Sequence, residues 1–206
     1  MAGSDRYIAY THRYFRFWLP VYDLFAFTIG NVYRKSVSRA EIAEGERVVD
    51  ICTGTGEMAR RLARAGASVT GIDVTLEMLA QASEKLPDAK IEFALMDARR
   101  LGFADRRFET AMLSLALHDM PRAVAIDVLR EAARVTSRRI LILDYELPRQ
   151  PVLHRLSVAA IRWFETVYFT RYAREGLEPL LLEAGLRQFA RTPFRGSFFA
   201  LWEVTL

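Results

Sequence analysis

Three carboxylates and a glycine-rich loop are the residues of this chain whose types and spacing are best suited to chemistry. Asp50 precedes the loop Gly54-Thr55-Gly56, and Asp73 and Asp97 each end one of the next two apolar stretches. Because each acid follows a short β-branched or apolar run, we expect all three at strand ends. The spacing of the loop also fits a dinucleotide-binding fingerprint, so the loop alone does not identify the ligand.

The charge of Asp50 favours one class of ligand. A dinucleotide places its pyrophosphate over the helix that follows the loop, where this carboxylate would repel it. S-adenosylmethionine instead presents an ammonium group that Asp50 suits, and the bare backbone of Gly54 and Gly56 allows close approach. The alternative is that Asp50 only hydrogen-bonds its own loop.

The other two acids suit the nucleoside part of such a ligand. Asp73 is placed to accept both ribose hydroxyls, which a nucleoside ligand of either kind would use. Asp97 is placed to accept the exocyclic amine of adenine, and the alternative for it is an N-cap or turn acid.

The elements that must position these acids alternate between strand and helix. Strand-like runs cover 47–51, 68–73, 90–97, 108–117 and 139–146, and helical patterns cover 57–66, 76–86 and 122–135. This alternation predicts a parallel sheet with helices on both faces.

The two ends of the chain differ from this middle part. Residues 5–40 are helical and rich in aromatic residues, and we expect Pro20 and Gly30 to break them into pieces. A second aromatic-rich helical segment covers 149–172. A helix at 176–186 and two runs separated by Arg195-Gly196 predict a closing antiparallel hairpin.

Five motifs together resemble the class I S-adenosylmethionine-dependent methyltransferases. They are DICTGTGE (50–57), GIDVTLEMLAQA (71–82), MDARRLGFADRRFET (96–110), LSLALHDMP (113–121) and LREAARVTSRRILILDYE (129–146). The pattern is most similar to that of the ubiquinone/menaquinone C-methyltransferases (methyltransferase type 11). Those enzymes have a Tyr-Asp segment that lies over the cofactor, and residues 21–37 of this chain, VYDLFAFTIGNVYRKSV, resemble it. Bacterial phosphatidylethanolamine N-methyltransferases resemble it too. The quinone group often has two histidines after the fourth strand, where this chain has His118 and Asp119.

The resemblance implies an α/β fold: a Rossmann-like, doubly wound, seven-stranded sheet, mainly parallel, with an antiparallel C-terminal strand. We expect one methyltransferase domain over 1–206. It would comprise a helical N-terminal cap (1–40), a cofactor-binding core (41–146), a helical insertion or lid (147–175) and a closing helix and hairpin (176–206).

The resemblance also implies the cofactor, S-adenosyl-L-methionine, with S-adenosyl-L-homocysteine as product. The residues expected to bind it are Tyr22, Asp50, Thr53, Gly54, Thr55, Gly56, Asp73, Val74, Met78, Asp97, Ala98, Ser114 and Leu115. Tyr22 would contact the cofactor or the acceptor, with cation–π attraction to the sulfonium; the alternative is helix packing.

Methyl transfer is an in-line displacement with a neutral leaving group, so the enzyme must chiefly orient the nucleophile and exclude water. His118, just past a strand end, is our candidate general base. The alternative is a residue that shapes the rim of the pocket.

We predict that an aromatic wall surrounds an apolar acceptor, formed by Tyr22, Phe25, Phe27, Trp163, Phe164, Tyr168 and Phe169. The alternative is that these rings pack the two segments together. Arg155, Arg162 and Arg171 suit either an anionic acceptor or a solvated helix face.

The composition narrows the function further. Cys52 is the only cysteine, so no internal disulfide is expected, and no apolar run approaches the length of a membrane span. The first residues lack the pattern of a signal peptide, and we expect a cytoplasmic protein, compatible with peripheral membrane contact. The net charge is +4, and no nucleic-acid methyltransferase motif or basic tail is present, so we expect no nucleic-acid partner. No metal is expected.

The sequence therefore predicts a methyltransferase for a small apolar, quinone-like or lipid-like acceptor. Two alternatives remain: a cofactor-binding sensor or accessory protein without turnover, and a phospholipid N-methyltransferase. The oligomeric state is not predicted.

Overall fold

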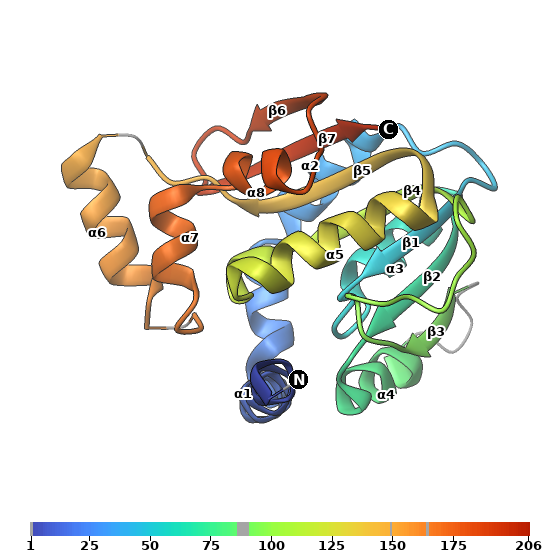
Figure 1. The fold of residues 1–206 in the computed structure, drawn as a ribbon, viewed down its shortest axis with the longest axis horizontal. Coiled ribbons are helices and arrows are strands. Elements are labelled where there is room, and N and C mark those ends of the chain that lie inside the picture. The colour runs from blue at the N-terminus through green and yellow to red at the C-terminus, as the bar shows by residue number, and fades with distance from the viewer. Residues whose placement is uncertain (1, 86–90, 149, 164) are drawn as a thin grey trace.

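Seven strands form one sheet in the order β3-β2-β1-β4-β5-β7-β6 (Figure 1). The structure is a computed structural model that describes residues 2–85, 91–148, 150–163 and 165–206, without the side chains of 2–5 and 20–27. The predicted fold, a mainly parallel α/β sheet closed by antiparallel strands, is confirmed.

The parallel part of the sheet is built around its most apolar strands. β1 (Arg47–Ile51) lies between β2 (Ser68–Asp73) and β4 (Phe108–Ser114), with β3 (Ile91–Leu95) at the edge. β1 and β4 are largely buried, as expected for parallel strands covered by helices on both faces. The strand predicted over 108–117 ends at Ser114, and a short 3-10 helix, η1 (Leu117–Asp119), follows.

The antiparallel part completes the other side of the sheet. β5 (Thr136–Tyr145) pairs in parallel with β4, and β7 (Phe199–Thr205) pairs antiparallel with both β5 and β6 (Phe189–Pro193). The predicted closing hairpin is confirmed.

Helices of the crossovers cover the two faces of this sheet. α3 (Glu57–Arg64) and α4 (Leu76–Lys85) follow β1 and β2, and α8 (Glu178–Glu183) lies against α5. α5 (Arg122–Val135) has the predicted bounds and crosses in front of the sheet in Figure 1. It buries Ala125, Ile126, Val128, Leu129, Ala132 and Val135, which recur at the three- and four-residue spacing of one helix face.

The N-terminal segment forms two helices, α1 (Ala2–Thr28) and α2 (Gly30–Ala40). The predicted break near Gly30 is confirmed, but the break predicted at Pro20 is wrong because α1 continues through it. A proline inside a helix removes one hydrogen bond and costs about 3 kcal/mol, which contacts elsewhere along the helix can offset. Arg16 of α1 lies 4.0 Å from Glu77 of α4, and Tyr7, Thr11 and Phe15 line a cleft described below.

The segment after β5 carries α6 (Pro151–Ile161) and α7 (Phe169–Glu175). α7 buries Phe169 and Tyr172 against the sheet, whereas α6 lies at the far left of Figure 1, beyond α7. Among the described residues, no helix is long and apolar enough to cross a membrane.

The buried carboxylate of Glu46, just before β1, connects β1 to strands β4 and β5. Glu46 accepts a hydrogen bond from Thr110 Oγ1 at 2.5 Å and pairs with Arg138 at 3.0 Å and Arg139 at 3.6 Å. Arg139 also donates to the carbonyl of Ala40, the last residue of α2. Burial opposes ionisation of Glu46, but these partners outweigh it and lower its pKa.

Candidate active site

A cleft opens where the sheet reverses its winding, between the carboxyl ends of β1 and β4. β1 has β2 on one side and β4 on the other, and such a switch point is where ligands bind in doubly wound sheets. The cleft measures about 500 Å³, counting the part open to solvent. Its lining residues are Tyr7, Thr11, Phe15, Cys52, Gly54, Asp73, Val74, Met78, Leu115, Ala116, Asp119 and Met120.

The structure brings five of the predicted cofactor residues together in this lining: Gly54, Asp73, Val74, Met78 and Leu115. They come from the loops after β1, β2 and β4 and from α4. Three lining residues on α1 were not predicted to belong to the site: Tyr7, Thr11 and Phe15. They reach it across the mouth of the cleft.

The backbone is strained where these loops leave the strands. Cys52 has φ 60° and Leu115 has φ 53°, a left-handed backbone conformation that residues other than glycine rarely adopt. Both residues line the cleft, one after β1 and the other after β4. Strain of this kind concentrates at functional sites, where the surrounding structure holds it in place.

Asp73 is the buried carboxylate of the cleft wall. Its Oδ2 accepts a hydrogen bond from the Gly54 amide at 3.0 Å, and its Oδ1 accepts one from the Thr75 amide at 2.8 Å. Burial raises the pKa of Asp73 despite these bonds. Each carboxylate oxygen has a second lone pair, so the group has acceptor capacity left for a ligand.

Asp50 is fully buried beneath the same loop and does not line the cleft. Thr53 Oγ1 donates to its Oδ2 at 2.6 Å, while Oδ1 has no hydrogen-bond partner among the described residues. Burial raises its pKa to about 7, with Thr53 and the backbone amide of Ala59 opposing the shift and the charge of Asp73 adding to it. An unpaired buried oxygen calls for a partner, and a cationic ligand group is one that fits; contact with the cofactor ammonium stays a prediction.

Asp97 already has a partner within the chain. The side chain of Arg99 donates to its carboxylate, and the Arg99 amide bonds its Oδ1 at 2.9 Å. The first of these bonds does most to lower the pKa of Asp97. The carboxylate is therefore ionised and held in place, and its predicted role toward adenine stays a prediction.

The remaining predicted residues lie around the loop without lining the cleft. Gly56, with φ 79°, precedes the first turn of α3, Thr53, Thr55 and Ala98 are buried, and Ser114 is partly buried at the end of β4. Tyr22 falls in α1, but its side chain lies outside the described part of the chain.

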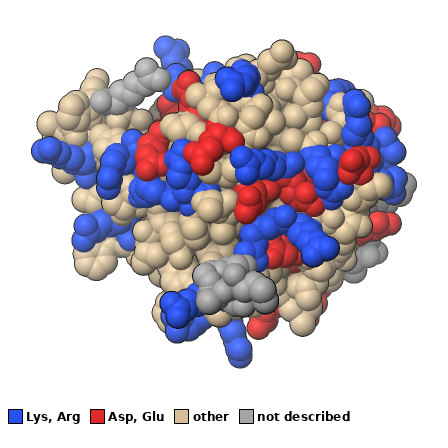
Figure 2. Space-filling model, viewed as in Figure 1, with Lys and Arg blue, Asp and Glu red and all other residues tan. Residues whose placement is uncertain are grey.

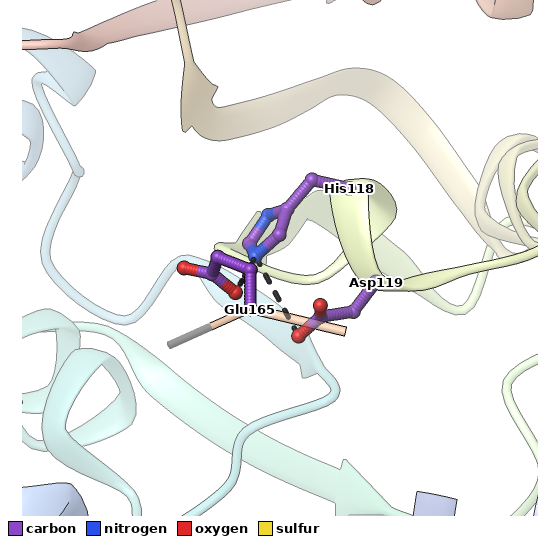
Figure 3. Close-up of side chains that lie close together, drawn as sticks. All are labelled: His118, Asp119 and Glu165. Carbon is purple, nitrogen blue, oxygen red and sulfur yellow. Dashed lines mark hydrogen bonds and ion pairs between the residues drawn. The ribbon is translucent and has the colours of Figure 1, made fainter. Parts of the chain in front are cut away.

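His118 is buried within a ring of three carboxylates, Asp119, Asp144 and Glu165, of which Figure 3 shows Asp119 and Glu165. Its Nδ1 lies 2.6 Å from Asp144 Oδ1, and its Nε2 lies 3.2 Å from Glu165 Oε2 and 3.5 Å from Asp119 Oδ2. The hydroxyl of Tyr145 donates to the other oxygen of Glu165 at 2.6 Å. Of these residues only Asp119 also lines the cleft.

The carboxylates determine the charge of His118. Burial alone would lower its pKa, but Asp144, Asp119 and Glu165 outweigh burial and hold the pKa well above its ordinary value. An imidazolium with both N–H groups donated to carboxylates has no lone pair with which to accept a proton. The role of His118 as general base stays a prediction, and this environment argues against it.

Asp119 combines exposure to the cleft with an unusual pKa. Burial raises that pKa to about 7, with the charge of His118 opposing the shift and that of Glu165 adding to it. Its Oδ1 accepts a hydrogen bond from the Thr166 amide at 3.4 Å, which ties the segment after α6 to the cleft. A carboxyl with a pKa near neutrality, beside a cleft, is suited to transferring a proton.

Among the described residues, this cluster is the place where a metal ion could be held. His118, Asp119 and Glu165 each offer a ligand atom, and these atoms lie within 4.8 Å of one another. An imidazolium at this place already supplies the positive charge that the carboxylates need, so the cluster does not require an ion.

The predicted aromatic wall is wrong for two of its members. Trp163 is 78% exposed, and Phe169 is fully buried against His118 and Tyr145 instead of lining the cleft. Tyr168 packs edge-on against Tyr7, so this part of the segment does reach the lining. Phe164 and the side chains of Tyr22, Phe25 and Phe27 lie outside the described residues.

The three arginines for which an anionic acceptor or a solvated helix face was predicted lie in different surroundings. Arg171 donates to the Met120 carbonyl at 2.9 Å, whereas Arg155 and Arg162 are exposed.

Comparison with known proteins finds similarity to methyltransferases. Residues 48–139 match a family described as a methyltransferase domain. A demethylmenaquinone methyltransferase of Beutenbergia cavernae is 33% identical over 129 residues, which cover 61% of this chain and 52% of that protein. The enzyme of the same description from Halalkalibacterium halodurans is 24% identical over 206 residues, covering 87% and 83%. The chain spans about half the length of several of these relatives.

Solved structures show the same fold. A putative O-methyltransferase from Nostoc punctiforme superposes with a TM-score of 0.73 at 14% identity, covering 92% of this chain and 60% of that one. Magnesium protoporphyrin IX methyltransferase from Synechocystis with bound S-adenosylmethionine superposes with a TM-score of 0.56 at 20% identity, covering 86% and 77%.

Proposed function

We infer that this chain belongs to the class I S-adenosylmethionine-dependent methyltransferases related to the quinone-biosynthesis enzymes. We propose that the chain transfers a methyl group from S-adenosylmethionine to a small apolar acceptor of quinone-like character. The observation that carries the proposal is the cleft at the switch point, where the loops after β1, β2 and β4 meet. The names of the quinone-biosynthesis relatives support the acceptor class.

The cofactor would bind with its nucleoside part along the loops after β1 and β2. Asp73 accepts the ribose hydroxyls in this arrangement, and Gly54 leaves room for the ligand beside it. Val74 and Met78 flank the adenine, Asp97 accepts its amine, and Asp50 faces the ammonium group through the loop. The methyl group would then lie toward Leu115 and Asp119.

The reaction exchanges one bond for another at the methyl carbon. The acceptor nucleophile forms a bond to carbon as the bond from carbon to sulfur breaks, and the sulfur departs as a neutral thioether. S-adenosylmethionine supplies the electrophilic methyl group when bound. The chain must orient the acceptor and keep water out, which Tyr7 and Phe15 do from the outer wall of the cleft.

The acceptor must also lose a proton if it reacts through a hydroxyl group or a quinol carbon. We propose that the Asp119 carboxylate takes this proton and that the His118 imidazolium beside it stabilises the charge of the acceptor. Asp119 is the member of the carboxylate ring that lines the cleft, and its pKa near 7 suits transfer at neutral pH.

The test measures binding and turnover separately. Calorimetry with S-adenosylmethionine, S-adenosylhomocysteine and NAD should show binding of the first two only. A screen for S-adenosylhomocysteine release should then find turnover with reduced naphthoquinones or benzoquinones. Turnover of phosphatidylethanolamine alone would favour the phospholipid alternative, and cofactor binding without turnover of any acceptor would favour a sensor. Binding of NAD alone would refute the proposal.

A further inference from the structure

The helix α6 and the turn after it expose a set of large apolar side chains to solvent. Five of them, between 48% and 78% exposed, form what we call the α6 face: Val152, Leu153, Leu156, Trp163 and Val167. Within α6 only Ser157 is buried. A helix of this length is marginal in water on its own, so its stability must come from burying an apolar face.

The charged residues within and directly beside α6 in the sequence are all basic. Arg155 and Arg162 are exposed beside the α6 face, and the sequence contains no Asp or Glu between Leu147 and Phe164. Figure 2 shows the left end of the molecule, where α6 lies, as uncharged surface with Lys and Arg. The next acid, Glu165, is turned inward to His118 and Tyr145. An apolar surface beside arginines complements a layer of anionic headgroups over hydrocarbon.

The α6 face continues directly into the wall of the cleft. Val167 belongs to the face, and its amide bonds the Tyr10 hydroxyl at 3.5 Å. The neighbouring residues Thr166 and Tyr168 contact Asp119 and Tyr7, both of which line the cleft. A small molecule that leaves a surface bound to the α6 face would therefore reach the cleft after passing only Thr166, Val167 and Tyr168.

We propose that the α6 face binds the surface of an anionic lipid bilayer and thereby brings the cleft to the membrane. The inference rests on the proposed function in one respect, because an apolar acceptor is supplied most readily from the bilayer in which it dissolves. The binding itself does not depend on turnover. Trp163 suits this place because an indole ring has an apolar body and a polar N–H, and such rings concentrate at membrane interfaces.

The experiment measures binding of the whole chain to vesicles of phosphatidylcholine with and without phosphatidylglycerol. We expect the chain to co-sediment with the anionic vesicles. Its affinity for neutral vesicles should be at least tenfold lower, and salt should weaken its binding to the anionic ones. Leu156→Ser combined with Trp163→Ser should reduce binding at least tenfold, because two large apolar contacts are lost. Arg155→Gln combined with Arg162→Gln should reduce the preference for anionic vesicles while leaving weak binding.

A matched control and a spectroscopic measurement make the test specific. Leu182→Ser removes a side chain that is 43% exposed on α8 and should leave vesicle binding within twofold. The fluorescence of Trp163 should shift to the blue on anionic vesicles, and Trp163→Phe should remove that shift. The other two tryptophans, Trp18 (partly buried on α1) and Trp202 (buried), remain in that variant, so a shift that persists would come from outside the α6 face. Unchanged calorimetric binding of S-adenosylhomocysteine shows that the variants fold.

Two outcomes would overturn the proposal. Vesicle binding that the α6 substitutions leave unchanged would place the membrane contact elsewhere. Absence of vesicle binding, with a dimer in sedimentation that the Leu156→Ser and Trp163→Ser variant dissociates, would show that a second copy of the chain covers the face. Neither outcome bears on S-adenosylmethionine turnover in solution, which tests the proposed function separately.

Discussion

Replacing Asp73 with alanine should weaken cofactor binding more than any other single change in the loops of the cleft. The carboxylate is buried, and each of its oxygens is held by one backbone amide, from Gly54 or Thr75. The free lone pairs are therefore fixed in direction before the ligand arrives. A bidentate bond to the two ribose hydroxyls would use both of them.

The expected loss follows from the number of bonds. Hydrogen bonds to a charged group contribute about 1.5–3 kcal/mol each, so two overlapping bonds amount to about 2–4 kcal/mol. That corresponds to roughly 30- to 1000-fold in affinity for S-adenosylhomocysteine. The two freed amides also lose their acceptor, so the variant should unfold at a lower temperature than the wild type.

The assay is calorimetric titration of S-adenosylhomocysteine and of an analogue without the 2′-hydroxyl group. The wild type should bind the analogue more weakly, whereas Asp73→Ala should bind both ligands alike. Asp127→Ala, which changes an acid 56% exposed on α5, is the control and should bind as the wild type does. An Asp73→Ala protein that folds and binds within threefold of the wild type would show that the ribose assignment is incorrect.

Three further predictions, one of them with a matched control, test other parts of the structure. Gly71→Ala places a Cβ atom 2.9 Å from the Phe93 ring and should cost about 1–3 kcal/mol in the free energy of unfolding, measured with urea; Gly102→Ala, where the nearest atom is at 3.8 Å, should cost less than about 1 kcal/mol. Glu46→Gln should lower stability at pH 7. Because the folded pKa of Glu46 lies below the 4.5 of an unpaired glutamate, the difference from wild type should begin to shrink as pH falls below about 4.5 and disappear once pH passes below the folded pKa. Asp119→Asn should reduce kcat/KM by about 10²- to 10⁴-fold and remove a rise in rate through about pH 7, with cofactor affinity unchanged; a variant that keeps both rate and pH profile would exclude Asp119 as the proton acceptor.

Much of the fold could be predicted because its signals are local. The residues of α5 repeat at the spacing of one helix face, and β1 and β2 are short apolar runs that end in or near an acid. Pro20 shows where local rules fail, because α1 passes through it. Contacts between α1 and distant parts of the chain decide that outcome, and propensity does not describe them.

Most of the predicted residues that line the cleft follow strand ends, and Met78 on α4 is the exception. Gly54, Asp73 and Leu115 could be found in this way, because parallel strands bring their carboxyl ends to one edge. Glu165 could not, because it comes 47 residues after His118 and reaches it only through the path of the segment after β5. A lone acid in an aromatic segment carries no sign of such a contact.

The position of β7 has a consequence for the order in which the molecule can form during synthesis. β7 pairs with β5 along seven residues, yet 199–205 follow every other strand in the chain. Until the ribosome has released them, β5 has β4 on one edge only, and its buried residues Ile140–Tyr145 have no strand on the other edge. An apolar strand with an open edge is a template for pairing with other chains. The nascent sheet therefore depends on β7, the last of its seven strands along the chain, for protection against aggregation. A messenger shortened before the codons for 199–205 should yield insoluble protein even though the cleft residues are all present.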